Sequence, residues 1–137
     1  INKKITKIIL MKKQIKKVAE FHKLFKIGNG KTIKSNIGEN TYNLRYNLMN
    51  EENNEYLIAC KNNDITEIAD ALGDQLYILF GTILKHGLQD KIENIFDEIH
   101  RSNLSKLDET GNPIFRHDGK ILKSSSYFKP DISKILK

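Results

Sequence analysis

Carboxylates crowd into two neighbouring segments between residues 51 and 74, and this crowding restricts how the chain can fold. In the first segment Glu51 and Glu55 are spaced i, i+4, so a helix places both on one side. Like charges at this spacing repel each other by roughly 0.2–0.5 kcal/mol. Two such helices lying side by side need a counter-ion, and a hard divalent cation takes oxygen ligands from several carboxylates at once. The acids concerned are Glu51, Glu52 and Glu55 in the first segment and Glu67, Asp70 and Asp74 in the second.

Length and composition predict one domain. The chain has 137 residues, of which 39% are hydrophobic and 29% charged, as is usual for a globular protein with one core. A single cysteine, Cys60, fits a reducing compartment, and no apolar run approaches the roughly 18 residues that a membrane-spanning helix needs. We therefore expect a cytoplasmic protein without a membrane partner.

The positive charge is concentrated near the N-terminus. Residues 1–31 carry ten lysines against Glu20 alone, a net charge of +9. Such a run could bind nucleic acid, but lysine runs are more often solvated helix faces or tails, so a nucleic-acid partner is not expected. Residues 1–11 are interpreted as a basic extension, either disordered or foreign to the native protein, and residues 12–137 as the domain.

Apolar spacing predicts four helices, over residues 12–26, 41–61, 65–87 and 89–100. Asp64, with Glu67 three residues later, suits a capping box at the start of the third. The segment 28–32 lacks the glycine and the preceding strand of a phosphate-binding loop, so we interpret it as a helix stop. Asp118-Gly119 favours a small hairpin near residues 113–123. The fold class is therefore all-α, with four to five helices and a short C-terminal loop or hairpin.

The acidic segments could be no more than a patterned surface. Against this, Asp70 and Asp74 lie among Ala71, Leu72 and Leu76, in the most apolar of the predicted helices. Carboxylates so close to buried positions must pair with cations. Four or five converging carboxylates suit one or two Mg²⁺ ions.

The acidic pattern resembles a known family. Glu-Glu-x-x-Glu at residues 51–55, followed by Glu-x-x-Asp at 67–70, is similar to the MazG-like all-α nucleoside triphosphate pyrophosphohydrolases. Their phosphoribosyl-ATP-pyrophosphohydrolase-like bacterial and phage subgroup resembles this chain further at residues 21–25 (Phe-His-x-x-Phe), 70–81, 99–106 and 118–131. Within these stretches lie the motifs Ser-Asn-x-x-Lys, at 102–106, and Gly-Lys-x-x-Lys, at 119–123. The resemblance covers residues 15–132 and implies a MazG-like helical bundle.

The resemblance implies an activity and assigns roles to the acids. The implied reaction is Mg²⁺-dependent hydrolysis of a (d)NTP between its α and β phosphates, giving a monophosphate and pyrophosphate. Mn²⁺ is expected to substitute for Mg²⁺, and the implied substrates include dUTP, dCTP or non-canonical nucleotides. Glu52 is the expected catalytic base that orients water, and Asp74 is expected to hold a lysine or a ligating water. The expected metal ligands are Glu51, Glu55, Glu67 and Asp70.

The same resemblance suggests substrate contacts, each with a structural alternative. Lys106, Lys120 and Lys123 are candidates for binding the phosphates, although each could be an ordinary surface lysine. Asn103 could contact a base or sugar or cap a turn, and Tyr127 could stack on a base or simply pack. His22 could line the nucleotide pocket or be a satisfied structural histidine.

The family's sites usually form between subunits, so the resemblance suggests a homodimer or a dimer of dimers.

Two hypotheses of other functional classes remain as alternatives to an enzyme. A basic nucleic-acid-binding helical protein would bind through residues 1–31 in a salt-sensitive way. A metal-stabilised helical scaffold would lose stability without metal but turn over no nucleotide.

Overall fold

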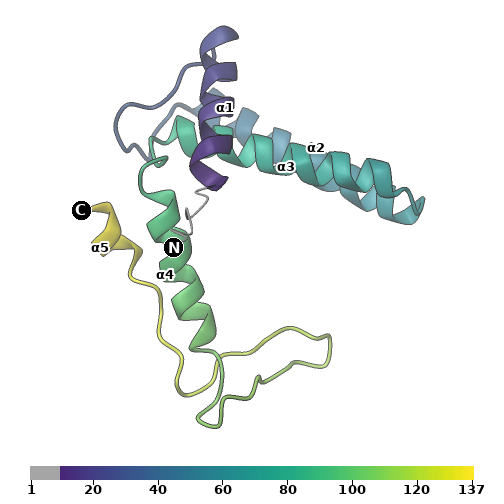
Figure 1. The fold of residues 1–137 in the computed structure, drawn as a ribbon, viewed down its shortest axis with the longest axis vertical. Helices are drawn as coiled ribbons and strands as arrows, with labels where there is room; N and C mark the ends of the chain where they lie inside the picture. The colour runs from purple at the N-terminus through teal and green to yellow at the C-terminus, as the bar shows by residue number, and fades with distance from the viewer. Residues whose placement is uncertain (1–9) are drawn as a thin grey trace, which may run out of the picture. The chain divides into compact units, whose positions relative to one another are not determined.

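The structure, a computed structural model, describes residues 10–137 and is helical, as predicted. The chain divides into two compact units, one ending at Gln89 and the other beginning at Asp90. The first contains α1, α2 and α3, and the second contains α4 and α5 (Figure 1). The predicted basic extension lies almost wholly in residues 1–9, outside the described residues. No described helix is long and apolar enough to cross a membrane.

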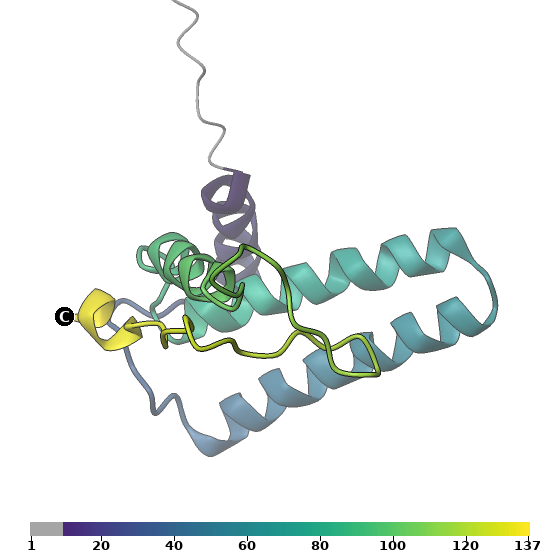
Figure 2. The ribbon, with the colours of Figure 1, turned by 90° about the horizontal axis from the view of Figure 1, so that it is seen from below.

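Two long antiparallel helices form the centre of the first unit (Figure 2). These are α2 (Glu39–Lys61) and α3 (Ile65–Lys85), joined by a turn at residues 62–64. Asp64 caps α3 as predicted, because its carboxylate accepts the N–H groups of Thr66 and Glu67, each at 3.1 Å. The second half of the predicted capping box is wrong, since the N–H of Asp64 donates to the Ala59 carbonyl instead.

Helix α1 (Leu10–Leu24) packs on α3 through one buried face. That face is Ile15, Val18 and His22, whose spacing of three and four residues places them on one side. The helix ends two residues before the predicted end, and the N–H groups of Ile27 and Gly28 donate to the His22 carbonyl. Gly28 has φ +83°, which confirms the predicted helix stop.

A glycine-rich loop then binds the C-terminal end of α3. The N–H of Gly30 donates to the Leu84 carbonyl at 2.8 Å, and the N–H of Lys34 donates to the His86 carbonyl at 3.0 Å. Gly87 has φ +70°, and a Cβ placed there would collide with the backbone carbonyl of Thr32. The loop and the helix end therefore approach more closely than any side chain at residue 87 would allow.

The apolar side chains of α3 are only partly buried within the first unit. Ile83 is buried at the end that α1 covers, but Leu72, Leu76 and Leu79 are exposed, with 54% of Leu76 accessible. On α2, Leu44, Leu57 and Ile58 are exposed in the same way. A pair of helices can cover only the faces that they turn toward each other, so these side chains stay accessible within the unit.

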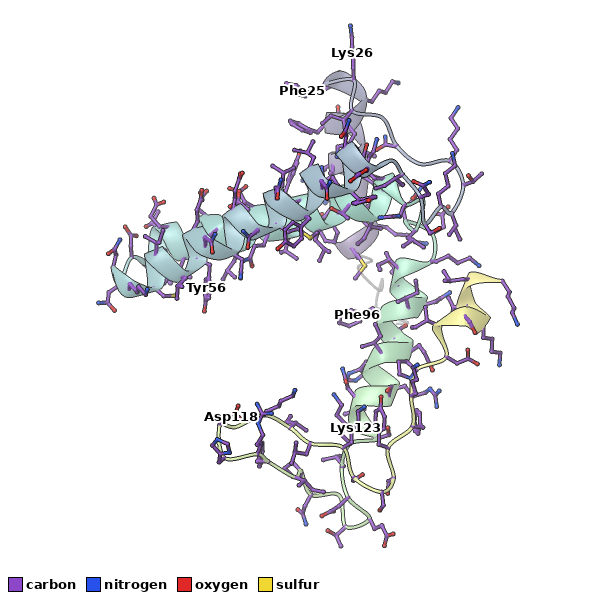
Figure 3. All side chains as sticks on the ribbon, turned by 180° about the vertical axis from the view of Figure 1, so that it is seen from behind. Phe25, Lys26, Tyr56, Phe96, Asp118 and Lys123 are labelled. Atoms are coloured by element: carbon purple, nitrogen blue, oxygen red, sulfur yellow. The ribbon has the colours of Figure 1, made fainter. Side chains whose placement is uncertain are left out.

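The second unit is built on α4 (Ile92–Leu104), with α5 (Ile132–Leu136) packed against it. Helix α4 begins three residues later and ends four residues later than the sequence predicted. Between the helices the chain forms the predicted hairpin in minimal form, with one antiparallel bridge between Phe115 and Ile121. Gly119, at φ +86°, closes its turn, and Asp118 lies at the tip (Figure 3).

Candidate active site

The predicted carboxylates lie on the α2–α3 hairpin, in its half nearer the turn. Glu52 is only half-exposed, whereas Glu51, Glu55, Glu67, Asp70 and Asp74 are exposed. At the same level the Gln75 side-chain amide donates to Asn53 Oδ1 at 3.4 Å, which joins the two helices beside the acids. The acids of both helices therefore lie together on one helical hairpin.

Glu52 is the acid most affected by its surroundings. Its Oε2 atom is buried and has no hydrogen-bond partner among the described residues. Burial raises the pKa of Glu52 above its ordinary value, and the neighbouring charges of Glu55, Asp74, Asp70 and Glu51 raise that pKa further. A carboxylate in this position favours a proton or a cation. Acids from both helices are thus close enough to act electrostatically on one another.

A second group of acids lies closer to the turn. Glu55 and Glu67 line the same small hollow, together with Asn62 and the cap residue Asp64. Glu55 therefore belongs to both groups. Within residues 10–137, no three acids, histidines or cysteines are placed to hold a metal ion together. The oxygen donors and the orphaned Glu52 oxygen fit a hard divalent cation chemically, and the roles of individual ligands stay predictions.

His22 lies in the interior of the first unit, with 2% of its surface exposed. Its Nδ1 is 3.1 Å from Asn29 Oδ1, and the Asn29 amide in turn donates to the Ala19 carbonyl. Burial lowers the pKa of His22, and the nearby Arg45 lowers it further. These contacts favour the structural alternative for His22, although its edge also lines a hollow beside residues 28–31.

Arg45 is a buried cation that sequence reasoning missed. Its Nε donates to Thr82 Oγ1 at 3.0 Å and its Nη2 to the Ile78 carbonyl at 2.6 Å. Gly81 lies against both Arg45 and His22, where a Cβ would be too close to either side chain. The signal available in the sequence was an arginine in the α3-facing register of α2, opposite a glycine within α3.

The predicted substrate contacts other than His22 lie in the second unit. Lys106 Nζ donates to Asn103 Oδ1 at 2.7 Å, and Lys123 Nζ lies 4.6 Å from the centre of the Tyr127 ring. Lys120 follows the hairpin turn, and its backbone N–H donates to Asp118. Four of the five candidates are therefore in contact in pairs, Lys106 with Asn103 and Lys123 with Tyr127. The Lys120 side chain is exposed.

Serines hold this segment in place, a role that sequence reasoning did not assign. Buried Ser102 donates to the Phe128 carbonyl at 2.8 Å, and Ser105 Oγ accepts the Phe128 N–H at 3.1 Å. Arg101 lies over the Phe128 ring and pairs with Glu98, which also accepts the N–H of Asp131. These bonds lower the pKa of Glu98 to about 2. The Ser-Asn-x-x-Lys motif therefore anchors the returning chain as well as supplying polar groups.

Comparison with known families agrees with this arrangement. An all-helical chain with acids on both helices of an antiparallel hairpin is consistent with the MazG-like all-α type. The phosphoribosyl-ATP pyrophosphohydrolase family (PRA-PH) matches residues 18–103, and the chain belongs to that family. The match includes every predicted acid, whereas Lys106, Lys120, Lys123 and Tyr127 lie beyond it. No individually curated protein matches the sequence significantly. The family is one of pyrophosphohydrolases, so the chain is a hydrolase for nucleotide-like substrates.

Proposed function

We propose that the protein is a Mg²⁺-dependent pyrophosphohydrolase that cleaves a (d)NTP between its α and β phosphates. The observation that carries the proposal is Glu52, with its orphaned buried oxygen and raised pKa among acids of two helices. A scaffold has no need for such a group, and a nucleic-acid-binding surface would be weakened by it. Family membership independently supports a pyrophosphohydrolase.

The chain's own residues would perform the reaction as follows. Glu52 accepts a proton from the attacking water, because a carboxylate with a raised pKa is a better base near neutral pH. The water oxygen bonds to phosphorus, and the anhydride bond between the α and β phosphates breaks. Its electron pair stays on the pyrophosphate oxygen. Lys106, Lys120 and Lys123 are proposed to bind the phosphate oxygens, as cations do in phosphoryl transfer.

The proposed metal ligands are Glu51, Glu55, Glu67 and Asp70. When bound there, Mg²⁺ would neutralise phosphate charge in the transition state. Asp74 is proposed to lie beside the ligands and to hold a lysine or a ligating water.

Pyrophosphate release from a panel of canonical and damaged dNTPs and NTPs tests this proposal. We expect monophosphate and pyrophosphate with Mg²⁺, no product with EDTA, and recovery when excess Mg²⁺ is restored. Absence of product from every nucleotide of the panel would contradict the proposal. If EDTA then still lowered the melting temperature, the scaffold hypothesis would replace it. Salt-sensitive binding of DNA or RNA would favour the nucleic-acid-binding hypothesis instead.

We also propose that a second copy of the chain covers the exposed apolar face of α2 and α3. Leu72, Leu76 and Leu79 follow one another at helical spacing on α3, and each is about half exposed. Burying such side chains stabilises an interface by about 25 cal/mol per Å² of apolar surface. The family resemblance suggests a homodimer or a dimer of dimers, which makes another copy the favoured occupant.

Sedimentation of a charged variant tests this assembly. We expect Leu76→Glu to shift the protein from dimer or tetramer toward monomer, because the new carboxylate would be desolvated at the interface. Leu24→Glu is the matched control, since Leu24 is an exposed leucine of α1 rather than of the α2–α3 face. A wild-type protein that sediments as a monomer, or equal effects of the two substitutions, would argue against this interface.

A further inference from the structure

Three aromatic side chains form a partly exposed cluster on the first unit. The Phe21 and Tyr77 rings meet edge to face with centroids 5.5 Å apart, and Phe25 stacks on Phe21 at 4.3 Å. All three remain accessible, with 40% of Tyr77 exposed. Phe25 directly follows the C-terminal end of α1 (Figure 3), so the cluster extends from α3 to that end of α1. Aromatic rings left accessible in this way can stack on a ligand.

Tyr77 shares a helix face with the acids. Glu67, Asp70, Asp74 and Tyr77 follow one another at spacings of three and four residues along α3. Tyr77 lies one turn beyond Asp74, and the rise from Asp70 to Tyr77 is roughly 10 Å at 1.5 Å per residue. This length is comparable to that of a nucleotide from its phosphates to its base. One face of α3 therefore carries acids for the phosphate end, followed by an aromatic ring.

We propose that Tyr77 stacks on the nucleobase of the substrate, with Phe21 as a positioning residue that holds the Tyr77 ring edge to face. The inference rests on the proposed function, because it takes the acids of α3 as the phosphate-binding end. Stacking tolerates any base, so the site would accept several nucleotides and rank them by stacking strength.

The alternative aromatic, Tyr127, is less well placed for this role. Lys123 already lies over its ring, so that one face is occupied. Tyr77, in contrast, is on the same helix as three of the acids. The structure thus distinguishes two tyrosines that the sequence alone did not separate.

Kinetics with two substitutions at residue 77 test the proposal. We expect Tyr77→Leu to raise the KM for dNTPs about tenfold, because the stacked ring is lost. Tyr77→Phe is expected to keep the wild-type KM, since it keeps the ring. Tripolyphosphate, which has no base, should inhibit all these variants equally. Tyr42→Leu is the matched control, a tyrosine of α2 with 47% exposure that lies outside the cluster. An unchanged KM in Tyr77→Leu, weaker inhibition by tripolyphosphate in the same variant, or a KM effect confined to Tyr127→Leu would overturn the proposal.

A binding measurement separates this inference from the proposed reaction. The chain has no tryptophan, so Tyr77→Trp introduces a single reporter. We expect nucleoside monophosphates to quench its fluorescence in the presence of Mg²⁺, and inorganic phosphate with Mg²⁺ not to do so. Quenching in a protein that turns over no nucleotide would support the base contact while the proposed reaction fails. Turnover of dNTPs without quenching would leave the reaction standing and refute the base contact.

Discussion

Glu52→Gln is expected to reduce kcat for (d)NTP hydrolysis by about 100-fold or more, the usual contribution of a positioned general base. The amide keeps the size of the side chain but cannot accept the proton of the attacking water. Because Glu52 is proposed as the base rather than a metal ligand, KM and the response to Mg²⁺ should change little. Pyrophosphate release at saturating Mg²⁺ measures this effect. Glu39→Gln, at an exposed acid of α2 outside the cluster, is the matched control and should keep wild-type kcat.

The same substitution should raise stability in the absence of divalent cations. The pKa of Glu52 is raised, so the folded state binds a proton more readily than the unfolded state does. Wild-type stability should therefore fall as pH rises from the ordinary glutamate range, about 4.3, through the raised pKa of Glu52. Glu52→Gln removes this dependence, and its melting temperature at pH 7 should exceed that of the wild type.

Added Mg²⁺ supplies the charge that the acids need, so it should raise the melting temperature of both proteins. Thermal melts at pH 5 and pH 7, with and without Mg²⁺, measure these effects. A Glu52→Gln protein that loses stability at pH 7 would show that Glu52 has a structural partner. One that keeps full activity would show that another acid is the base.

Much of this arrangement could be predicted from the sequence because the signals are local. Helix periods, the Asp64 cap and the Asp-Gly turn each depend on residues within a few positions of one another. The acidic pattern likewise depends on spacing along single helices. The hairpin places acids of both helices near Glu52, although within residues 10–137 no three of them are placed to hold a metal ion together. Boundaries were less accurate, as at α4, because tertiary contacts decide where a helix begins and ends.

The missed features depend on contacts between distant segments. Nothing near Arg45 in the sequence indicates that its guanidinium reaches Thr82, and nothing near Ser102 indicates that it binds the Phe128 carbonyl. Apolar spacing predicts α3 as a helix, but periodicity does not tell whether the same chain or a second one covers its apolar side chains. Likewise, the sequence could not place Tyr77 beside Phe21.

Gly87→Ala is expected to destabilise the first unit by about 2–5 kcal/mol, through two separate costs. The backbone at Gly87 has φ +70°, a conformation that costs an alanine roughly 1–2 kcal/mol. The new Cβ also collides with the Thr32 carbonyl, a backbone group that cannot rotate away. Forcing the loop and the end of α3 apart adds about 1–3 kcal/mol, as overpacking does in a core. Urea unfolding followed by helical circular dichroism measures the sum.

Gly38→Ala separates the two costs within the same unit. Gly38 has φ +91°, but its Cβ would meet only Thr41 Oγ1, at an ordinary 3.9 Å. This variant should therefore lose only the conformational term, about 1–2 kcal/mol. If the loop 28–37 is held as described, Gly87→Ala should also speed hydrogen exchange at the N–H groups of Gly30 and Lys34, and Gly38→Ala should not. An equal loss of unfolding free energy in the two variants would mean that the loop moves away from α3 at little cost. Its contact with α3 would then contribute little to the stability of the helices that carry the acids.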